Sequence, residues 1–340
     1  MQRLLMNEAE LQILFNMLGD QLTVEYPLFD FDLFIAKPQG TFYEFDTRGK
    51  KKEFDQSLSS YPDYFDELPE YHDYVDCMLS SGVIEYDNLN KFIHLFEQIR
   101  KWPETKQACY CPDTNIFYHR FFSNFSKIKA NEVVLIKTIE EEIKAALSHK
   151  YDQKIKDIFR NLNTTQKRFF DEIIDRRTKK ARRAAYLAQR EFRKIKHGAL
   201  EILSGVSESK PDNDYNDAII VKTACQAKQD RYEFLYLLTA DAGVAGRCED
   251  SQLSCFLFNV PLDSYSIRCS NHAFCELMYD LARVFGFIKL NSVVLFGEFR
   301  DKYLAKSDQI MVEIPNEKLF TEVEKHLKIC RGLSALKIKE

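Results

Sequence analysis

Four acidic residues that lie far apart in the sequence occupy similar places beside apolar segments. Asp113 follows the run ACYC, and Asp241 ends the run FLYLLTAD. Glu142 lies in KTIEEEIKAAL directly after VVLI, and Asp217 begins DAIIVKTACQAK. In open α/β sheets, ligands bind at the carboxyl ends of the strands. If the apolar runs are parallel strands with helices between them, the four carboxylates can meet at one such edge.

Four converging carboxylates would repel one another strongly unless a cation neutralised them. Hard oxygen ligands of this kind suit Mg²⁺ or Mn²⁺, and a bound divalent ion can activate water for attack on a phosphodiester. Each acid also has a structural explanation. Asp217 can cap a helix, Asp241 can serve a turn, and Glu142 is one of three consecutive glutamates. The order and context of all four together favour the chemical interpretation.

The elements that would position these acids indicate a parallel α/β core. ACYC, VVLI, FLYLLTAD and CFLFNVP are short apolar runs that predict buried strands. An amphipathic helix with Ile139 and Ile143 on its apolar face is predicted after VVLI. Strands that alternate with helices favour a parallel sheet between two helical layers. We therefore predict a three-layer α/β fold for residues 106–262.

A long basic segment interrupts this core, and we interpret about 150–210 as a helical insertion. Pro is absent there and the first Gly is Gly198, which predicts a helix from Thr164 or Thr165 to Gly205. Its apolar residues recur every three or four positions, which is typical of a coiled coil or helical hairpin and allows a homo-oligomer. The apolar stripe comprises Phe170, Ile174, Ala181, Ala184, Ala188, Phe192, Ile195, Ala199 and Ile202.

The charge distribution suggests a nucleic-acid contact for the insertion. The net charge is only −4, so the chain as a whole has no field that attracts nucleic acid. Residues 150–198, however, hold 16 Lys and Arg against 6 Asp and Glu, whereas residues 41–90 hold 4 against 12. A cationic helix can follow a phosphate backbone. The alternative explanations are that both regions are solvated faces, or that the acidic and the basic region face each other. The candidate contacts are Arg176, Arg177, Lys179, Lys180, Arg182 and Arg183. Bases could stack on Tyr186 or Phe192 if these face outward.

The flanking regions carry no recognisable chemistry. Residues 1–105 predict a mixed accessory region of helices and strands. Residues 263–340 predict a small α+β unit, with a helix after Asn271, two strands and a last helix capped by Asn316. We therefore expect three parts, the core and its two flanking regions.

The composition and the cysteine pattern indicate the cellular environment in which we expect the protein. No apolar run reaches the roughly 18 residues of a membrane helix, and the first residues lack the features of a secretory signal. The nine Cys are scattered without a CxxC pair, which is typical of reduced thiols, so we expect a cytoplasmic protein. One group matches no zinc-binding spacing and favours buried core thiols instead: Cys248, Cys255, Cys269, His272 and Cys275.

The motifs around the four acids resemble the PIN-domain family of nucleases. The resemblance rests on PDTN after the first strand, VVLIKTIEEEI, NDAIIVKTA and YLLTAD. The family usually shows Asp-Thr/Ser-Asn, a Glu before an aliphatic residue, an Asp that opens an aliphatic helix, and a strand that ends in Thr-x-Asp. The resemblance covers about 107–147 and 211–262. It implies that Asp113, Glu142, Asp217 and Asp241 bind metal, with Thr114, Asn115 and Thr239 as supporting polar groups.

One position of the family pattern has two candidate residues in this sequence, and the sequence differs from the pattern in two places. Within EEE, Glu142 fits the helical phase best, and Glu141 is the alternative. The insertion separates Glu142 from Asp217 by 75 positions. The acid or Asn that often follows the last Asp is replaced by the run AGVA at 242–245. This second departure weakens the case for a second metal ion more than the case for one.

The resemblance implies a metal-dependent endonuclease that uses Mg²⁺ or Mn²⁺, with RNA favoured as substrate. A phosphatase with an aspartyl nucleophile would need a second Asp two residues after Asp113, where the sequence has Asn115. The remaining alternative is a catalytically inactive nucleic-acid or protein interaction module on the same fold. His119 could contact a phosphate, but a lone His is more commonly a surface or packing residue.

Overall fold

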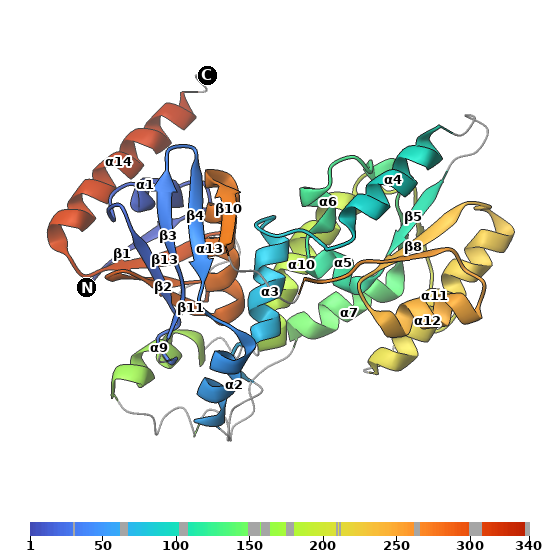
Figure 1. Cartoon of the computed structure of the whole chain (residues 1–340), viewed down its shortest axis with the longest axis horizontal. Coiled ribbons are helices and arrows are strands. Elements are labelled where there is room, and N and C mark those ends of the chain that lie inside the picture. The colour runs from blue at the N-terminus through green and yellow to red at the C-terminus, as the bar shows by residue number, and fades with distance from the viewer. Residues whose placement is uncertain are drawn as a thin grey trace. The chain divides into compact units, whose positions relative to one another are not determined.

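The chain divides into two compact units, which we describe separately. Unit 1 comprises Met1–Val83, Lys150–Arg183 and Asp263–Glu340, and unit 2 comprises Ile84–His149 and Ala184–Leu262. Figure 1 shows the computed structural model, which describes residues 1–29, 31–61, 67–101, 108–148, 157, 164–174, 180–208, 210, 212–261, 266–298 and 308–336. None of the helices formed by these residues is both long and apolar enough to cross a bilayer.

Unit 2 is built on a parallel sheet. β5 (Cys109–Pro112), β8 (Leu235–Thr239) and β9 (Cys255–Leu257) pair in that order, all parallel. β6 (Val134–Ile136) pairs in parallel with β7 (Glu201–Leu203), and a parallel bridge between Tyr110 and Val133 places β6 beside β5. The spatial order is therefore β7-β6-β5-β8-β9. This is the doubly wound order, in which β5, the first strand of the unit, lies in the middle of the sheet.

One helix of unit 2, α4 (Leu89–Arg100), precedes β5, and the others lie between these strands in the chain. These others are α5 (Thr114–Tyr118), α6 (Phe121–Asn124), α7 (Lys137–Ser148), α10 (Lys180–Lys196), α11 (Asn213–Asp230) and α12 (Ala242–Asp250). In Figure 1, α4, α6 and α10 lie on the opposite side of β8 from α11 and α12. The predicted α/β fold with a parallel sheet and helices is thus confirmed, as are the four predicted strands and the helix after VVLI.

The long helix predicted up to Gly205 is wrong. α9 (Thr164–Ile174) and α10 are separate elements, and α10 ends at Lys196. A side chain at Gly198 would lie only 2.9 Å from the Cβ of Ala130, so the chain passes closely there. The backbone N–H of Leu200 then donates to the carbonyl of Val133, and the chain continues as β7 instead of helix.

The apolar stripe does not form one coiled-coil seam. Ala188, Phe192 and Ile195 are buried, and the ring of Phe192 lies 5.2 Å from that of Phe117 in the same unit. Phe170 belongs to unit 1, where it packs edge-on against Phe287. These residues therefore fill the cores of a single copy of the chain.

Unit 1 is built on an eight-stranded antiparallel sheet. Its order is β1-β13-β12-β11-β2-β3-β4-β10. The strands are β1 (Gln2–Met6), β2 (Leu22–Glu25), β3 (Asp32–Gln39), β4 (Phe42–Thr47), β10 (Ser266–Ser270), β11 (Phe287–Leu290), β12 (Val293–Phe296) and β13 (Ile310–Ile314). The two flanking regions that the sequence suggests as separate parts therefore share one sheet, with Gln2 paired to Ile314. The assignment of functional domains stays a prediction.

The core of unit 1 forms around α13 (Asn271–Phe285), whose residues from Phe274 to Phe285 are all buried. Phe274 stacks on Tyr43 of β4 at a centroid distance of 4.0 Å. The other helices are α1 (Leu11–Phe15), α2 (Lys51–Ser59), α3 (Tyr71–Ser80), α9 and α14 (Glu317–Ala335). Asn316 caps α14 as predicted, because its side chain accepts from the N–H of Leu319 at 3.0 Å.

Candidate functional site

The carboxyl ends of β5 and β8 create a natural binding position in unit 2. The two strands are neighbours, with Pro112 opposite Leu238. After β5 the chain continues towards β6 on one side, and after β8 it continues towards β9 on the other. Such a reversal of strand order opens a crevice at the sheet edge, where open α/β folds bind ligands. Asp113 and Asp241 each follow one of these two strands.

Asp113 is buried at the start of α5 and is held by three hydrogen bonds. It is only 3% exposed. Its Oδ1 accepts from the N–H of Thr114 at 2.7 Å. Its Oδ2 accepts from the Thr239 hydroxyl at 2.8 Å and from the Asn115 side-chain amide at 2.9 Å. The carboxylate is therefore fixed in orientation by two of the three predicted supporting residues and by the backbone of the third.

Asn115 and Thr239 also connect Asp113 to the loop that carries Asp241. The side-chain oxygen of Asn115 accepts from the N–H of Ala240 at 3.0 Å. The hydroxyl oxygen of Thr239 accepts from the N–H of Asp241 at 2.9 Å. Asp241 itself is the N-cap of α12 and accepts from the N–H groups of Gly243 and Val244 at 2.6 and 3.2 Å. The two strand ends thus form one hydrogen-bonded unit.

Among the three consecutive glutamates, only Glu142 is bonded to this network. It accepts a hydrogen bond from the hydroxyl of Thr114. Glu140 instead pairs with Lys144 and Lys196, at 2.7 and 2.8 Å. Glu141 pairs with Lys137 at 3.2 Å, one helical turn away. The helical phase used to choose Glu142 over Glu141 therefore agrees with the geometry.

Asp217 lies one turn later in its helix than expected. The sequence suggests that Asp217 opens the helix, but α11 begins at Asn213 and is capped by Asp212, which accepts from the N–H of Tyr215 at 3.2 Å. Asp217 is therefore a residue of the second turn. Its neighbour Asn216 is buried and hydrogen-bonds Glu142, and so links α11 to α7.

The four acids share one strongly negative environment. Burial raises the pKa of Asp113 to about 6, hydrogen bonds from Thr239 and Thr114 oppose the shift, and the charges of Glu142 and Asp241 add to it. Burial likewise raises the pKa of Asp217 to about 6, with added repulsion from Asp113 and Asp241. Burial and the charge of Asp217 raise the pKa of Glu142, against hydrogen bonds from Thr114 and Asn216. Asp113, Glu142 and Asp217 therefore each feel the charge of at least one other acid of the group.

The acids are close enough to repel but are not packed into a coordination shell. No three of these acids place carboxylate oxygens within 4.8 Å of one another. Among the described residues, the only group of three possible ligands with that spacing is Glu8, His272 and Glu276. Oxygen ligands lie about 2.0–2.6 Å from Mg²⁺ or Ca²⁺, so the side chains would have to move inward to share an ion. The donor set consists of four carboxylates, and the pKa values of Asp113, Glu142 and Asp217 are raised. Such a set fits a hard divalent cation.

Arg247 and Asn216 are parts of the site that sequence reasoning missed. Arg247 on α12 lies 3.4 Å from Asp214 of α11, and its charge lowers the pKa of Asp217 against the effect of burial. The letters NDA before the aliphatic helix were a signal for Asn216, whereas nothing in the local sequence marks Arg247.

A comparison with protein-family models decides the identity of this part of unit 2. Residues 110–258 match the model of the PIN domain. These residues form a PIN domain. The match spans β5 to β9 and includes all four acids of the site. A search of curated proteins and a search of solved structures return no match to the chain.

The PIN domain gives the site a chemical setting. It is a nuclease-type fold, its members are generally nucleases that use divalent metals, and the domain suggests interaction with nucleic acid. The positions that carry Asp113, Glu142, Asp217 and Asp241 all lie within the matched range. The individual roles of these residues in this chain stay a proposal.

The predicted nucleic-acid contacts are described only in part. Arg176, Arg177 and Lys179 lie outside the described residues. Lys180, Arg182 and Arg183 lie in the first turn of α10, and their side chains are not described. Of the two rings suggested for base stacking, Phe192 is buried and Tyr186 is partly exposed. His119 is also buried and shares a hydrogen bond with the Tyr86 hydroxyl at 2.8 Å, so it is a packing residue.

Proposed function

We propose that the PIN domain is a metal-dependent endonuclease that hydrolyses phosphodiester bonds, with RNA as the favoured substrate. The observation that carries this proposal is the mutual repulsion of Asp113, Glu142, Asp217 and Asp241 beside the point where the strand order reverses. Repulsion of this kind costs stability in the free protein and is relieved when a cation binds. A structural role alone gives no reason to gather four acids there.

The residues of the site fall into two groups in this proposal, those that hold the metal and those that orient them. Asp113 and Asp241, with Glu142 and Asp217 from two helices, would hold Mg²⁺ or Mn²⁺, which supplies a lowered water pKa and a charge that stabilises the phosphate. Thr239, Asn115 and Thr114 orient the carboxylates through the hydrogen bonds described above. Oriented ligands bind metal more tightly than free ones, because their conformations are fixed before binding.

Nucleic-acid binding is assigned to the basic region before and within α10. Arg176, Arg177, Lys179, Lys180, Arg182 and Arg183 give this region its positive charge. Contacts from such residues to phosphates are sequence-independent and weaken steeply with salt. The acids of the PIN domain would then supply the chemistry, and the basic region would supply the affinity.

A cleavage assay tests the proposed activity. Single-stranded RNA and single-stranded DNA of the same sequence are incubated with the full chain and with Mg²⁺ or Mn²⁺. The wild type should cleave RNA faster than DNA, and Asp113→Asn and Asp241→Asn should lose activity while they keep the fold, as measured by circular dichroism. Equal cleavage by wild type and both variants would assign the activity to a contaminant.

A second candidate function is a non-catalytic nucleic-acid or protein interaction module. The wide spacing of the four acids favours it, because no three of them approach within the spacing found at Glu8, His272 and Glu276. So does the AGVA run at 242–245 in place of a further acid. RNA binding without cleavage in the presence of either metal would support this alternative.

A further inference from the structure

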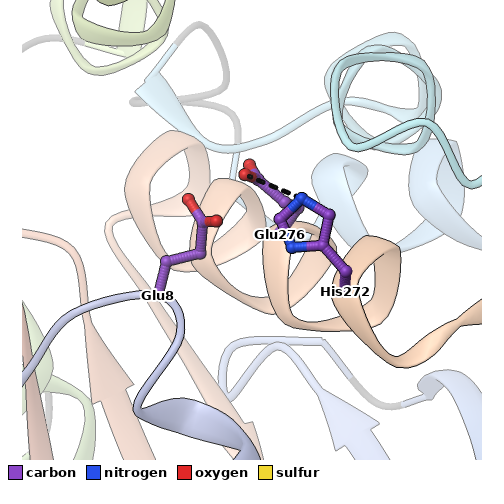
Figure 2. A group of neighbouring side chains, drawn as sticks. All are labelled: Glu8, His272 and Glu276. Atoms are coloured by element: carbon purple, nitrogen blue, oxygen red, sulfur yellow. Dashed lines mark ion pairs between the residues drawn. The ribbon is translucent and has the colours of Figure 1, made fainter. Parts of the chain in front are cut away.

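Unit 1 holds a second group of side chains that can ligate a metal, outside the residues of the PIN domain. It consists of Glu8, His272 and Glu276, each of which offers one ligand atom, all within 4.8 Å of one another. His272 and Glu276 lie one turn apart on α13, with the ring Nε2 4.0 Å from Oε1 of Glu276. Figure 2 shows the carboxylate of Glu8 directed towards the same space from the turn before α1.

The local structure places these three side chains by independent means. Residues four apart on a helix share one face, and Ser270 fixes the start of α13 by accepting from the N–H of Ala273 at 3.1 Å. Glu8 is held in a turn closed by Asn7 and Glu10, whose side chains each accept from the other's backbone N–H at 3.0 and 2.9 Å. Local hydrogen bonds therefore hold both the start of α13 and the turn before α1, the two elements that carry the group.

The chemistry of the group differs from that of the PIN-domain acids. An imidazole suits Zn²⁺ and related transition ions, whereas an all-carboxylate set suits Mg²⁺ and Mn²⁺. At Zn–N and Zn–O distances near 2.0–2.2 Å, tetrahedral ligand atoms lie about 3.4 Å apart. The 4.0 Å between His272 and Glu276 needs only a small side-chain rotation to reach that value. The three ligands would leave one position open for water.

The charge around the group also favours a cation. Glu276 is buried to 7% exposure, while the side chain of His272 is 79% exposed, so an ion could enter from solvent on the His side. Two of the three side chains are carboxylates, whose negative charge attracts a cation.

We propose that Glu8, His272 and Glu276 form a Zn²⁺ site that ties the turn before α1 to the beginning of α13. The site would join two segments that are more than 260 positions apart in the chain. Binding of the ion to the folded state alone would stabilise that state.

Calorimetry with Zn²⁺ on the full chain tests this site. The metal-stripped protein is titrated at pH 7 with Mg²⁺ in excess, so that oxygen-only sites are filled. We expect one Zn²⁺ per chain and a higher melting temperature. His272→Ala and Glu8→Gln should weaken binding at least about tenfold, because even residues that only orient a ligand change affinity roughly 10- to 100-fold.

A matched control is available on α3. His72 and Asp76 form the same one-turn pair, with a distance of 3.3 Å and a His side chain 72% exposed. No third ligand joins them among the described residues, so His72→Ala should bind Zn²⁺ like the wild type. If the wild type takes up no Zn²⁺, or if His272→Ala binds as tightly as the wild type, the proposal is wrong. His272 is exposed, so its substitution leaves the fold intact.

Discussion

The hydroxyl of Thr239, at the end of β8, donates a 2.8 Å hydrogen bond to Oδ2 of Asp113, which follows β5. These residues are 126 positions apart in the sequence. Thr239 is fully buried, and its oxygen also accepts from the backbone of Asp241. One threonine thus sets the position of two acids at the strand ends, and the geometry of the site depends on it.

Replacement of this threonine should weaken the site without removing any proposed metal ligand. We expect Thr239→Val to lower Mn²⁺ affinity and cleavage activity roughly 10- to 100-fold, because it removes one of the three hydrogen bonds that orient the carboxylate of Asp113. Thr223→Val is the control, since Thr223 is likewise buried but donates within α11, to the carbonyl of Ile219 at 2.7 Å. Equal effects of the two variants on activity would show that the loss reflects stability alone.

The three glutamates of α7 offer a comparison within one helix. Glu142→Gln should reduce cleavage by about 100-fold or more, the scale expected when one charge that serves the transition state is removed. Glu141→Gln removes the charge that pairs with Lys137 and should leave the rate unchanged. RNA cleavage rates at saturating Mn²⁺ decide between them. A larger loss in Glu141→Gln would overturn the placement of the site.

Metal binding should depend on pH near 6. Asp113 and Asp217 both have a pKa of about 6, raised mainly by burial, and both must lose their protons to bind a cation. The affinity for Mn²⁺ should therefore fall as the pH drops below about 6, by up to roughly tenfold per pH unit for each carboxyl. Above pH 7 it should be nearly constant. An affinity that stays level from pH 5 to pH 8 would contradict this.

The same shift predicts a stabilising variant. The pKa of Asp217 is higher in the folded chain than the ordinary Asp value of 3.8, so the folded state is favoured when this carboxyl is protonated. Its contribution to the free energy of unfolding is therefore present below pH 3.8 and is lost as the pH rises through about 6. Without metal, Asp217→Asn should raise the melting temperature by a few degrees at pH 7.5. The gain should vanish near pH 4, where the wild-type carboxyl is protonated as well. Melting curves without metal at the two pH values provide the test.

The strand ends of the PIN domain were predictable because their signals are local. Short apolar runs such as VVLI and FLYLLTAD are bounded by polar residues, and both runs form strands. Glu142 was predictable from helical phase, because Ile139 and Ile143 are both buried. In these places the periodicity of side chains and the fold agree.

Other features depend on contacts that a single sequence does not reveal. β7 has only three residues, and Ile202 in its centre is exposed, so no alternation marks it as a strand. Its pairing with β6 is set by the tertiary structure. The sheet of unit 1 joins both ends of the chain, as in the pair of Gln2 and Ile314. The start of α11 was missed because the cap at Asp212 follows a polar loop with several equally suitable residues.

The most direct test of the central claim is calorimetric titration of the full chain with Mn²⁺ at pH 7.5. The titration uses the His272→Ala variant, so that the group of Glu8, His272 and Glu276 does not take up Mn²⁺. The account predicts that this protein binds Mn²⁺ and that adding Asp113→Asn and Asp241→Asn abolishes the binding. Binding that persists after both substitutions, or no binding in the parent, would contradict the claim that these acids form a metal site.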